Sequence, residues 1–278
     1  MRLKKTLVHS VVALTLVLGF AAPAIAQETL RAITAESVIE SIKKRGAIKI
    51  GLSLFKPWSM RSKKGDLVGF ELDVGRKLAE DMGVEVEFVP TAWDGIIPAL
   101  LSAKFDVIIS GMSYTTKRAL TVNFSDPYAY SGVGMLANIK LTKGFTLEDF
   151  NKSSVTFTAR RGATPAALTK KNFPNATLLL FDEDGASGQE VINGNAHATL
   201  ASEPYPGTTA ATYSDVVYRP FPDHMFEQNG EGFVMRKGDP DAINFFNNWI
   251  AENWRNNFLQ ESHDYWFAGT DWHSLVDN

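Results

Sequence analysis

The chain has 278 residues, long enough to bury one large hydrophobic core or two medium ones. Its 28 lysine and arginine residues against 31 aspartate and glutamate residues make nucleic acid and anionic membrane surfaces poor candidates for partners. The sequence contains no cysteine, which excludes disulfide bonds, thiolate metal sites and cysteine nucleophiles.

The N-terminus has the pattern of a secretory leader. Basic residues within 2–5 precede a largely apolar stretch at 7–20, and Ala-Ile-Ala at 24–26 supplies the small residues of a cleavage site. An uncleaved membrane anchor is the alternative, but the apolar stretch is short for a membrane span. We expect cleavage after Ala26. The mature chain would then begin at Gln27 with 25 basic and 31 acidic residues, and no cysteine is available for a lipid anchor.

Short β-rich runs alternate with helical stretches in the first half of the chain. The predicted elements are a strand at 47–52, a helix at 69–82, a strand at 84–89, a helix at 96–103 and a strand at 106–110. The last strand is apolar almost throughout, which is typical of a parallel strand covered on both faces. Residues 111–114 follow it at its carboxyl end, the edge where ligands bind in open α/β sheets.

The same alternation restarts near residue 154. It predicts strands at 155–158, 176–181 and 196–201, and helices at 164–173 and 188–193. Two further helices are expected at 240–257 and 259–267, the first capped by Asp239 and opened by Pro240. Two units of one pattern indicate an α/β protein with two lobes.

Arg118 closes a stretch that begins at Ser110, just past the predicted buried strand. A guanidinium can hold a carboxylate through two parallel hydrogen bonds. Ser113 adds a hydroxyl group, and the backbone at Gly111 can approach a ligand closely. The alternative is that Arg118 is a solvated helix residue.

Three aromatic residues stand near the ends of the first two strands, namely Phe55, Trp58 and Trp93. Such residues can form the walls of a ligand pocket, or they can belong to the core. The four tryptophans of the helical tail are expected to pack, and they are Trp249, Trp254, Trp266 and Trp272.

Ala163, Thr164 and Pro165 mark a helix start, with Thr164 as the cap and Pro165 as the first helical residue. The free N–H groups of such a terminus attract an anion, although ordinary capping explains the pattern equally well.

No catalytic or metal-binding motif is present. The histidines lack the spacing of metal ligands, and there is no nucleophile elbow and no phosphate-binding loop. The acidic run 182–185 resembles a calcium loop, but its register would make Leu180 and Val191 ligands. We therefore predict no metal and no cofactor.

Several motifs resemble the bacterial extracellular solute-binding proteins of family 3, the polar amino-acid receptors of ABC importers. The matching segments are 69–79 (GFELDVGRKLA), 93–100 (WDGIIPAL), 105–112 (FDVIISGM) and 123–128 (NFSDPY), together with Arg118. They are distributed over nearly all of the predicted mature chain.

The resemblance implies a two-lobed type II periplasmic-binding fold, each lobe a mostly parallel sheet flanked by helices, joined by two crossing strands. Lobe 1 would comprise residues 27–134 and 234–278, and lobe 2 residues 135–233, with the hinge at 132–136 and 232–235. The lobes would close around the ligand, as such proteins are known to do. The protein would be a periplasmic monomer that delivers its ligand to a membrane permease.

The resemblance also assigns ligand contacts. Arg118 and Ser113 match the residues that hold the α-carboxylate, and Ser110, Gly111 and Thr164 match backbone contacts. Phe55 and Trp93 match the aromatics that enclose the ligand.

The resemblance fails at two positions. Ser202 and Leu52 stand where family members commonly have aspartate. Glu203, next to Ser202, could hold the ligand ammonium instead. Trp58, Ala163 and Tyr205 are further candidate contacts. An ordinary amino acid is the first expectation, and an alkylated ammonium such as a betaine, held by cation–π contact, is the alternative.

An enzyme is the rival from another class, because cyclohexadienyl dehydratases resemble this family. Their catalytic acid would fall in residues 204–207, which contain no carboxylate. A sensory ligand-binding domain is a third reading, but no kinase, channel or membrane segment follows.

Overall fold

The computed structural model describes residues 37–276, so the predicted leader and its cleavage point lie outside it. The strands are β1 (Ala47–Leu52), β2 (Met60–Arg61), β3 (Leu67–Val68), β4 (Glu85–Pro90), β5 (Val107–Ile108), β6 (Asn123–Asn138), β7 (Thr156–Arg160), β8 (Thr177–Phe181), β9 (Ala198–Ser202), β10 (Val217–Tyr218) and β11 (Glu227–Met235). The helices are α2 (Val38–Arg45), α3 (Phe70–Met82), α4 (Ile96–Leu101), α5 (Thr116–Ala119), α6 (Ile139–Thr142), α7 (Thr164–Asn172), α8 (Asp184–Ile192), α9 (Tyr205–Thr212), α10 (Pro240–Arg255) and α11 (Phe258–Phe267), with 3-10 helices η1 (Trp93–Gly95) and η2 (Asp271–Leu275).

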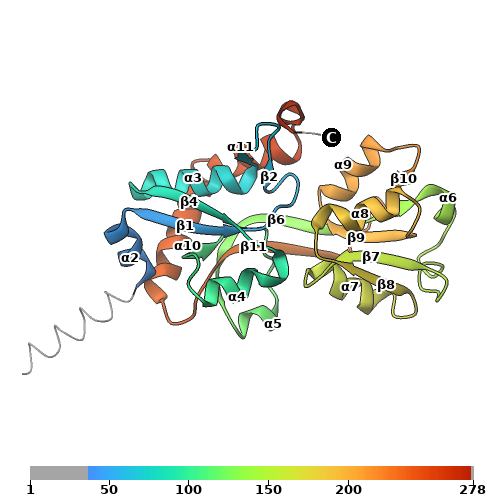
Figure 1. The fold of residues 1–278 in the computed structure, drawn as a ribbon, viewed down its shortest axis with the longest axis horizontal. Helices are drawn as coiled ribbons and strands as arrows, with labels where there is room; N and C mark the ends of the chain where they lie inside the picture. The colour runs from blue at the N-terminus through green and yellow to red at the C-terminus, as the bar shows by residue number, and fades with distance from the viewer. Residues whose placement is uncertain (1–36, 277–278) are drawn as a thin grey trace, which may run out of the picture.

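Two lobes lie side by side and share one nine-stranded sheet (Figure 1). The strand order is β4-β1-β5-β11-β6-β9-β7-β8, and β10 pairs with β6. In lobe 1, β1 lies parallel between β4 and β5; in lobe 2, β7 lies parallel between β8 and β9. The predicted fold class, two α/β lobes joined by two crossing strands, is confirmed.

The crossing strands are β6 and β11, which run antiparallel to each other. Their pairing extends from Asn123 opposite Met235 to Val133 opposite Glu227. From Val133 onward β6 also pairs with β9 of lobe 2. The register of β11 shifts on both sides of Gly232, as in a β-bulge. The predicted lobe boundaries, after residues 134 and 233, fall within these strands and stay a prediction.

Each lobe has buried clusters on both faces of its part of the sheet. In lobe 1, Val107 and Ile109 belong to the cluster that packs under α3 and α10, while Ile108 belongs to the cluster around α4. Because successive strand residues point to opposite faces, an uninterrupted apolar run is what a doubly covered strand requires. In lobe 2, Phe157 and Leu200 belong to one cluster, and the smaller cluster forms around Val191.

The helix α3 begins where only glycine fits. Gly69 has a φ of +135°, and a Cβ at this position would lie 2.5 Å from the carbonyl oxygen of Trp58. Its buried face includes Val74 and Leu78 and, one turn earlier, Glu71. The helix therefore carries a carboxyl group into the interior of lobe 1.

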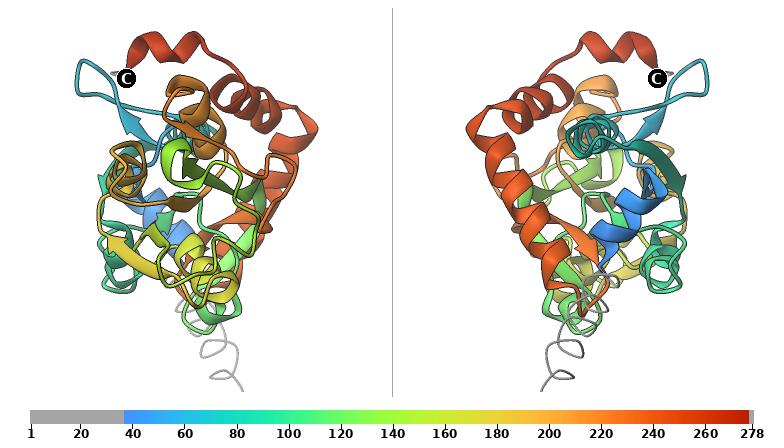
Figure 2. Two further views of the ribbon diagram at one scale, coloured as in Figure 1. Left: turned by 90° about the vertical axis from the view of Figure 1, so that its right-hand side faces the viewer. Right: turned by 90° about the vertical axis from the view of Figure 1, so that its left-hand side faces the viewer.

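The C-terminal helices run along one side of the molecule, in orange and red in Figure 2. Their tryptophans pack into the lobe 1 core or against it, as predicted. Two of them also donate hydrogen bonds to carboxylates of α3, from Trp249 to Asp81 at 2.8 Å and from Trp266 to Asp73 at 2.7 Å. Within residues 37–276, no helix combines the length and the apolar character needed to cross a membrane.

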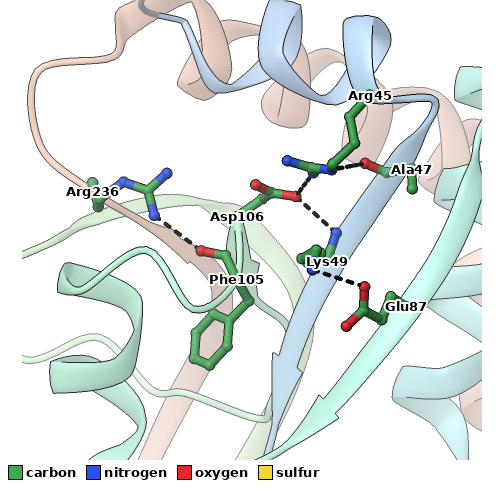
Figure 3. A network of polar contacts seen from close by, with 7 residues as sticks. All are labelled: Arg45, Ala47, Lys49, Glu87, Phe105, Asp106 and Arg236. Atoms are coloured by element: carbon green, nitrogen blue, oxygen red, sulfur yellow. Dashed lines mark hydrogen bonds and ion pairs between the residues drawn. The ribbon is translucent and has the colours of Figure 1, made fainter.

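Polar contacts hold the amino ends of β1 and β5 together (Figure 3). The carboxylate of Asp106 accepts hydrogen bonds from the Lys49 backbone N–H, at 2.8 Å, and from the guanidinium of Arg45. Arg236 donates to the Phe105 carbonyl at 3.0 Å. These contacts lie at the ends of the strands that face away from residues 110–113.

Candidate functional site

The carboxyl ends of strands from both lobes meet at a cavity that lies between the lobes. It encloses about 650 Å³ of atom-free space, including its opening to solvent. The predicted residues that line it are Phe55, Trp58, Trp93, Ser110, Gly111, Ser113, Arg118, Ala163, Thr164 and Ser202.

The lobe 1 side of the cavity is built around Gly111. Its φ of +50° suits glycine, and a Cβ there would lie 3.3 Å from the Trp58 ring. The Gly111 N–H donates to the Tyr128 hydroxyl at 2.9 Å, so this N–H is already used within the protein. The neighbouring Ser110 hydroxyl accepts from the backbone N–H of Ser53 at 2.8 Å.

Arg118 lies in the short helix α5, where its own backbone N–H donates to the cap, the Thr115 hydroxyl, at 3.1 Å. Its guanidinium donates to the Ser113 carbonyl at 2.9 Å and, across the cleft, to the Gly162 carbonyl of lobe 2 at 3.2 Å. Burial lowers the pKa of Arg118 to about 10. The side chain is therefore still charged at neutral pH.

A second arginine, which no sequence motif indicated, lines the cavity from lobe 2. Arg160 is the last residue of β7 and donates to the Ser53 hydroxyl of lobe 1 at 2.6 Å. Its guanidinium carbon lies 5.3 Å from the centroid of the Trp93 ring, and that of Arg118 lies 5.4 Å from the same centroid. Both cations therefore adjoin one indole.

Glu71 is a second lining residue that was missed. Its side chain is fully buried, and one carboxyl oxygen accepts from the Tyr128 hydroxyl at 3.0 Å. Burial raises the pKa of Glu71 to about 8, against the opposing effect of this hydrogen bond. The carboxyl group is thus mostly protonated at pH 7.

The start of α7 differs from the prediction by one position. Ala163 rather than Thr164 is the cap, Thr164 is the first helical residue, and no side chain caps this terminus. The first backbone N–H groups of a helix lack intrahelical partners and carry partial positive charge. Since Ala163, Thr164 and Pro165 all line the cavity, this terminus adds positive potential to it. Ser187 of α8, also missed, completes the lobe 2 side.

Glu203 and Tyr205 are not among the cavity-lining residues. The carboxylate of Glu203 pairs with Arg219 at 2.9 Å, and Glu203 borders a different hollow on the crossing strands. Tyr205 lies behind Phe55, with their ring centroids 6.1 Å apart. The predicted replacement of an aspartate by Glu203 is therefore not supported, because this carboxylate already has a cationic partner.

No described cluster of three or more His, Asp or Glu side chains is arranged to hold a metal ion between residues 37 and 276. The arrangement instead offers two cations, hydroxyl groups, a helix terminus and aromatic walls. These groups suit a small anionic solute.

A model of the bacterial extracellular solute-binding proteins, family 3, matches residues 48–269. The chain belongs to this family. This solute-binding protein is 27% identical over 247 residues to the L-cystine-binding protein of Escherichia coli (strain K12), an alignment that covers 88% of this chain and 91% of that protein. It is 28% identical over 163 residues to the cyclohexadienyl dehydratase of Pseudomonas aeruginosa, covering 58% of this chain and 61% of the enzyme.

Among solved structures, it resembles a putative binding component of an ABC transporter from Wolinella succinogenes, complexed with lysine. The TM-score is 0.77 at 34% identity, and the match covers 82% of this chain and 99% of that one. The match supports the two-lobed periplasmic-binding fold.

Proposed function

We propose that this solute-binding protein is the periplasmic component of an ABC importer and captures an amino acid or an amino-acid-like carboxylate. The observation that carries the proposal is the place of Arg118, whose guanidinium lines a cavity to which both lobes contribute. Carbonyl groups engage two of its N–H donors, and a guanidinium has five. Donors therefore remain for a solute carboxylate.

The neighbouring groups have complementary roles in this proposal. Ser113 and Ser110 support the carboxylate on lobe 1, and Gly111, which has no side chain, leaves room for its close approach. Thr164 and Ser202 add contacts from lobe 2 when the lobes close, and Phe55 and Trp93 enclose the rest of the solute. Closure removes the charges from water. Each electrostatic contact is stronger in the closed cavity than in water, because the dielectric constant is lower there.

Export and delivery complete the proposal. The leader is cleaved after Ala26, and the protein acts as a monomer in the periplasm, with no nucleic-acid partner. Closure shapes the surface that an inner-membrane permease recognises. The family membership and the relatives named for amino-acid binding support this reading.

Arg118→Ala should abolish most of the affinity. Loss of charge-assisted hydrogen bonds worth about 1.5–3 kcal/mol corresponds to a dissociation constant that is roughly 10- to 100-fold larger. Calorimetric titration of the exported protein with a panel of amino acids measures it. Arg255→Ala, on the exposed last turn of α10, is the control and should bind as the wild type does. Undiminished affinity in Arg118→Ala would show that the anchor lies elsewhere.

A dehydratase is the second candidate, favoured by the Pseudomonas relative and by Glu71, a carboxyl group in the cavity that keeps its proton at pH 7. We propose that the protein is nevertheless not an enzyme. Residues 204–207 contain no carboxylate, and Glu203 is paired with Arg219. Incubation with prephenate or arogenate should give no turnover. Turnover that Glu71→Gln abolishes would overturn the transport reading.

A further inference from the structure

A groove next to the solute cavity is formed by both lobes. It encloses about 1,230 Å³, including open solvent, and is lined by α5 of lobe 1 and by α7 of lobe 2 (Figure 1). The groove shares Arg118, Ala163 and Thr164 with the cavity, so the two hollows adjoin each other. A partner in the groove would therefore contact both lobes without occupying the solute cavity.

The charged side chains of the groove all have the same sign. They are Lys117 and Arg118 of lobe 1 and Lys170 of lobe 2, and no acidic side chain of the described chain lines the groove. Both lysines are exposed, and neither is paired with a described carboxylate. The groove is thus basic, although the whole chain has 31 acidic against 28 basic residues. A surface of one sign attracts a partner of the opposite sign.

The groove also has apolar side chains from both lobes. Ile97 of α4 lines it from lobe 1, and Ala166 of α7 and Leu180 of β8 line it from lobe 2. Leu120, which precedes the lining residue Thr121, is 75% exposed. Exposed apolar side chains rimmed by polar and charged groups are typical of protein-binding surfaces. A protein segment that has both acidic and apolar side chains fits this groove.

The groove depends on the closed arrangement of the lobes. Its two walls are joined by the hydrogen bond from the Arg118 guanidinium to the Gly162 carbonyl, at 3.2 Å, and both residues line the groove. Lys117 is next to Arg118, whereas Lys170 belongs to the other lobe. Separation of the lobes would break this bond and move the two lysines apart. A partner that needs both lysines would therefore distinguish the closed protein from the open one.

We propose that the groove binds an acidic periplasmic segment of the inner-membrane permease, and that this segment contacts Lys117 and Lys170 at the same time. Carboxylates of the segment would pair with the lysines, and its apolar side chains would pack on Ile97 and Leu180. Exposed ion pairs add little affinity, but they steer association and fix orientation. The inference rests on the proposed function and identifies the surface through which the solute is delivered.

The test is uptake of a radiolabelled amino-acid mixture by cells in which the gene for this protein has been deleted and replaced by a variant. Lys117→Glu/Lys170→Glu should reduce the uptake that depends on this protein by at least about tenfold, because both contacts become repulsive. An immunoblot of the periplasm should show the wild-type amount of protein. Calorimetric titration with the same amino acids should give affinities within about threefold of the wild type, because neither lysine lines the cavity and exposed charges are screened by salt.

The control is Lys44→Glu/Lys140→Glu, which makes the same change in net charge with one substitution in each lobe. Lys44 lies in the last turn of α2 and Lys140 in α6, at opposite ends of the molecule (Figure 1). The control should transport as the wild type does. Lys117→Glu and Lys170→Glu alone should each give an intermediate loss, because each removes one of the two contacts.

Equal uptake by Lys117→Glu/Lys170→Glu and the control would overturn this inference and leave the proposed function standing. Binding of the wild type to phosphatidylglycerol vesicles that the double variant loses would assign the groove to the membrane surface instead. A dimer in sedimentation that the double variant loses would assign it to a second copy of the chain, and either result would overturn the inference. Uptake that is the same with and without the gene would count against the proposed function itself.

Discussion

At the scale of single residues, the crossing strands contain an unusual acid. Glu231 of β11 is 1% exposed, and one of its oxygens accepts from the Ser131 hydroxyl of β6 at 2.6 Å. The other oxygen has no hydrogen-bond partner within the described residues. Burial raises the pKa of Glu231 to about 8, as it does for Glu71. Two buried carboxyl groups thus keep their protons near neutral pH. Glu71 lines the cavity, and Glu231 lies in the crossing strand β11.

These raised pKa values predict how stability depends on pH. The pKa of both carboxyl groups in the unfolded chain is about 4.5. Below this pH, Glu71 and Glu231 are protonated in the folded and the unfolded state, so they do not lower the free energy of unfolding. As the pH rises toward 8 the unfolded state releases protons that the folded state retains, so stability falls. Glu231→Gln should remove the part of this loss of stability that Glu231 causes. The variant should therefore be more stable than the wild type by about 2–4 kcal/mol at pH 8, with little difference at pH 4.5.

Urea unfolding at both pH values measures this effect. Glu227→Gln, a partly exposed carboxylate on the same strand, is the matched control and should follow the wild type. If Glu231→Gln lost stability with pH as steeply as the wild type, Glu231 would be ionised in the folded protein.

At the scale of elements, the two ends of each strand have different tasks. The carboxyl ends of β1, β5, β7 and β9 lead into the cavity, while the amino ends of β1 and β5 are joined through Asp106 (Figure 3). Asp106 ties the first strand to the end of α2 through Arg45. Substitutions at this end should change stability and leave solute binding intact.

Asp106→Ala should lower the free energy of unfolding by about 1.5–3 kcal/mol, because a buried carboxylate hydrogen-bonded to a backbone N–H and a guanidinium is lost. Lys49→Met is the control on the same strand. Its ammonium pairs with Glu87 at 3.0 Å on the surface, and such pairs contribute less than about 1 kcal/mol. Urea unfolding gives both values, and equal losses would contradict the assignment.

Periodicity predicted the regular elements with errors of a few residues. β1 has the predicted bounds, and α3 begins one residue later than predicted. The hairpin of β2 and β3 was missed because its strands are only two residues long. β6 was missed as one continuous strand, because Pro127, Ser131 and Gly132 interrupt its alternation and its pairing partners are distant in the sequence.

Two cavity residues that were not predicted, Arg160 and Glu71, lie at positions that the sequence pattern does indicate. Arg160 ends a parallel strand, as the residues before Ser110 do, so the same strand-end argument identifies it. Glu71 precedes Val74 and Leu78 by three and seven residues, which places it on the apolar face of its helix. The ion pair of Glu203 with Arg219 could not be foreseen, because it depends on a contact between segments sixteen residues apart whose turn the sequence does not specify.

At the scale of the whole molecule, the lobes are two halves of one sheet. β6 and β11 run through both, and separate clusters of buried side chains lie on either side of them. Bending of the crossing strands can therefore change the width of the cavity while each core remains packed. The cavity residues come from both lobes, so solute binding and the angle between the lobes are coupled.

Both arginines of the cavity also reach across the cleft, Arg118 to the Gly162 carbonyl and Arg160 to the Ser53 hydroxyl. Opening of the lobes has to break these two bonds, and bonds that must break before opening slow the release of a solute more than its arrival. A permease that separates the lobes would break the same bonds. Unloading at the membrane would then depend on breaking contacts between the lobes, with no change in the charge of either side chain.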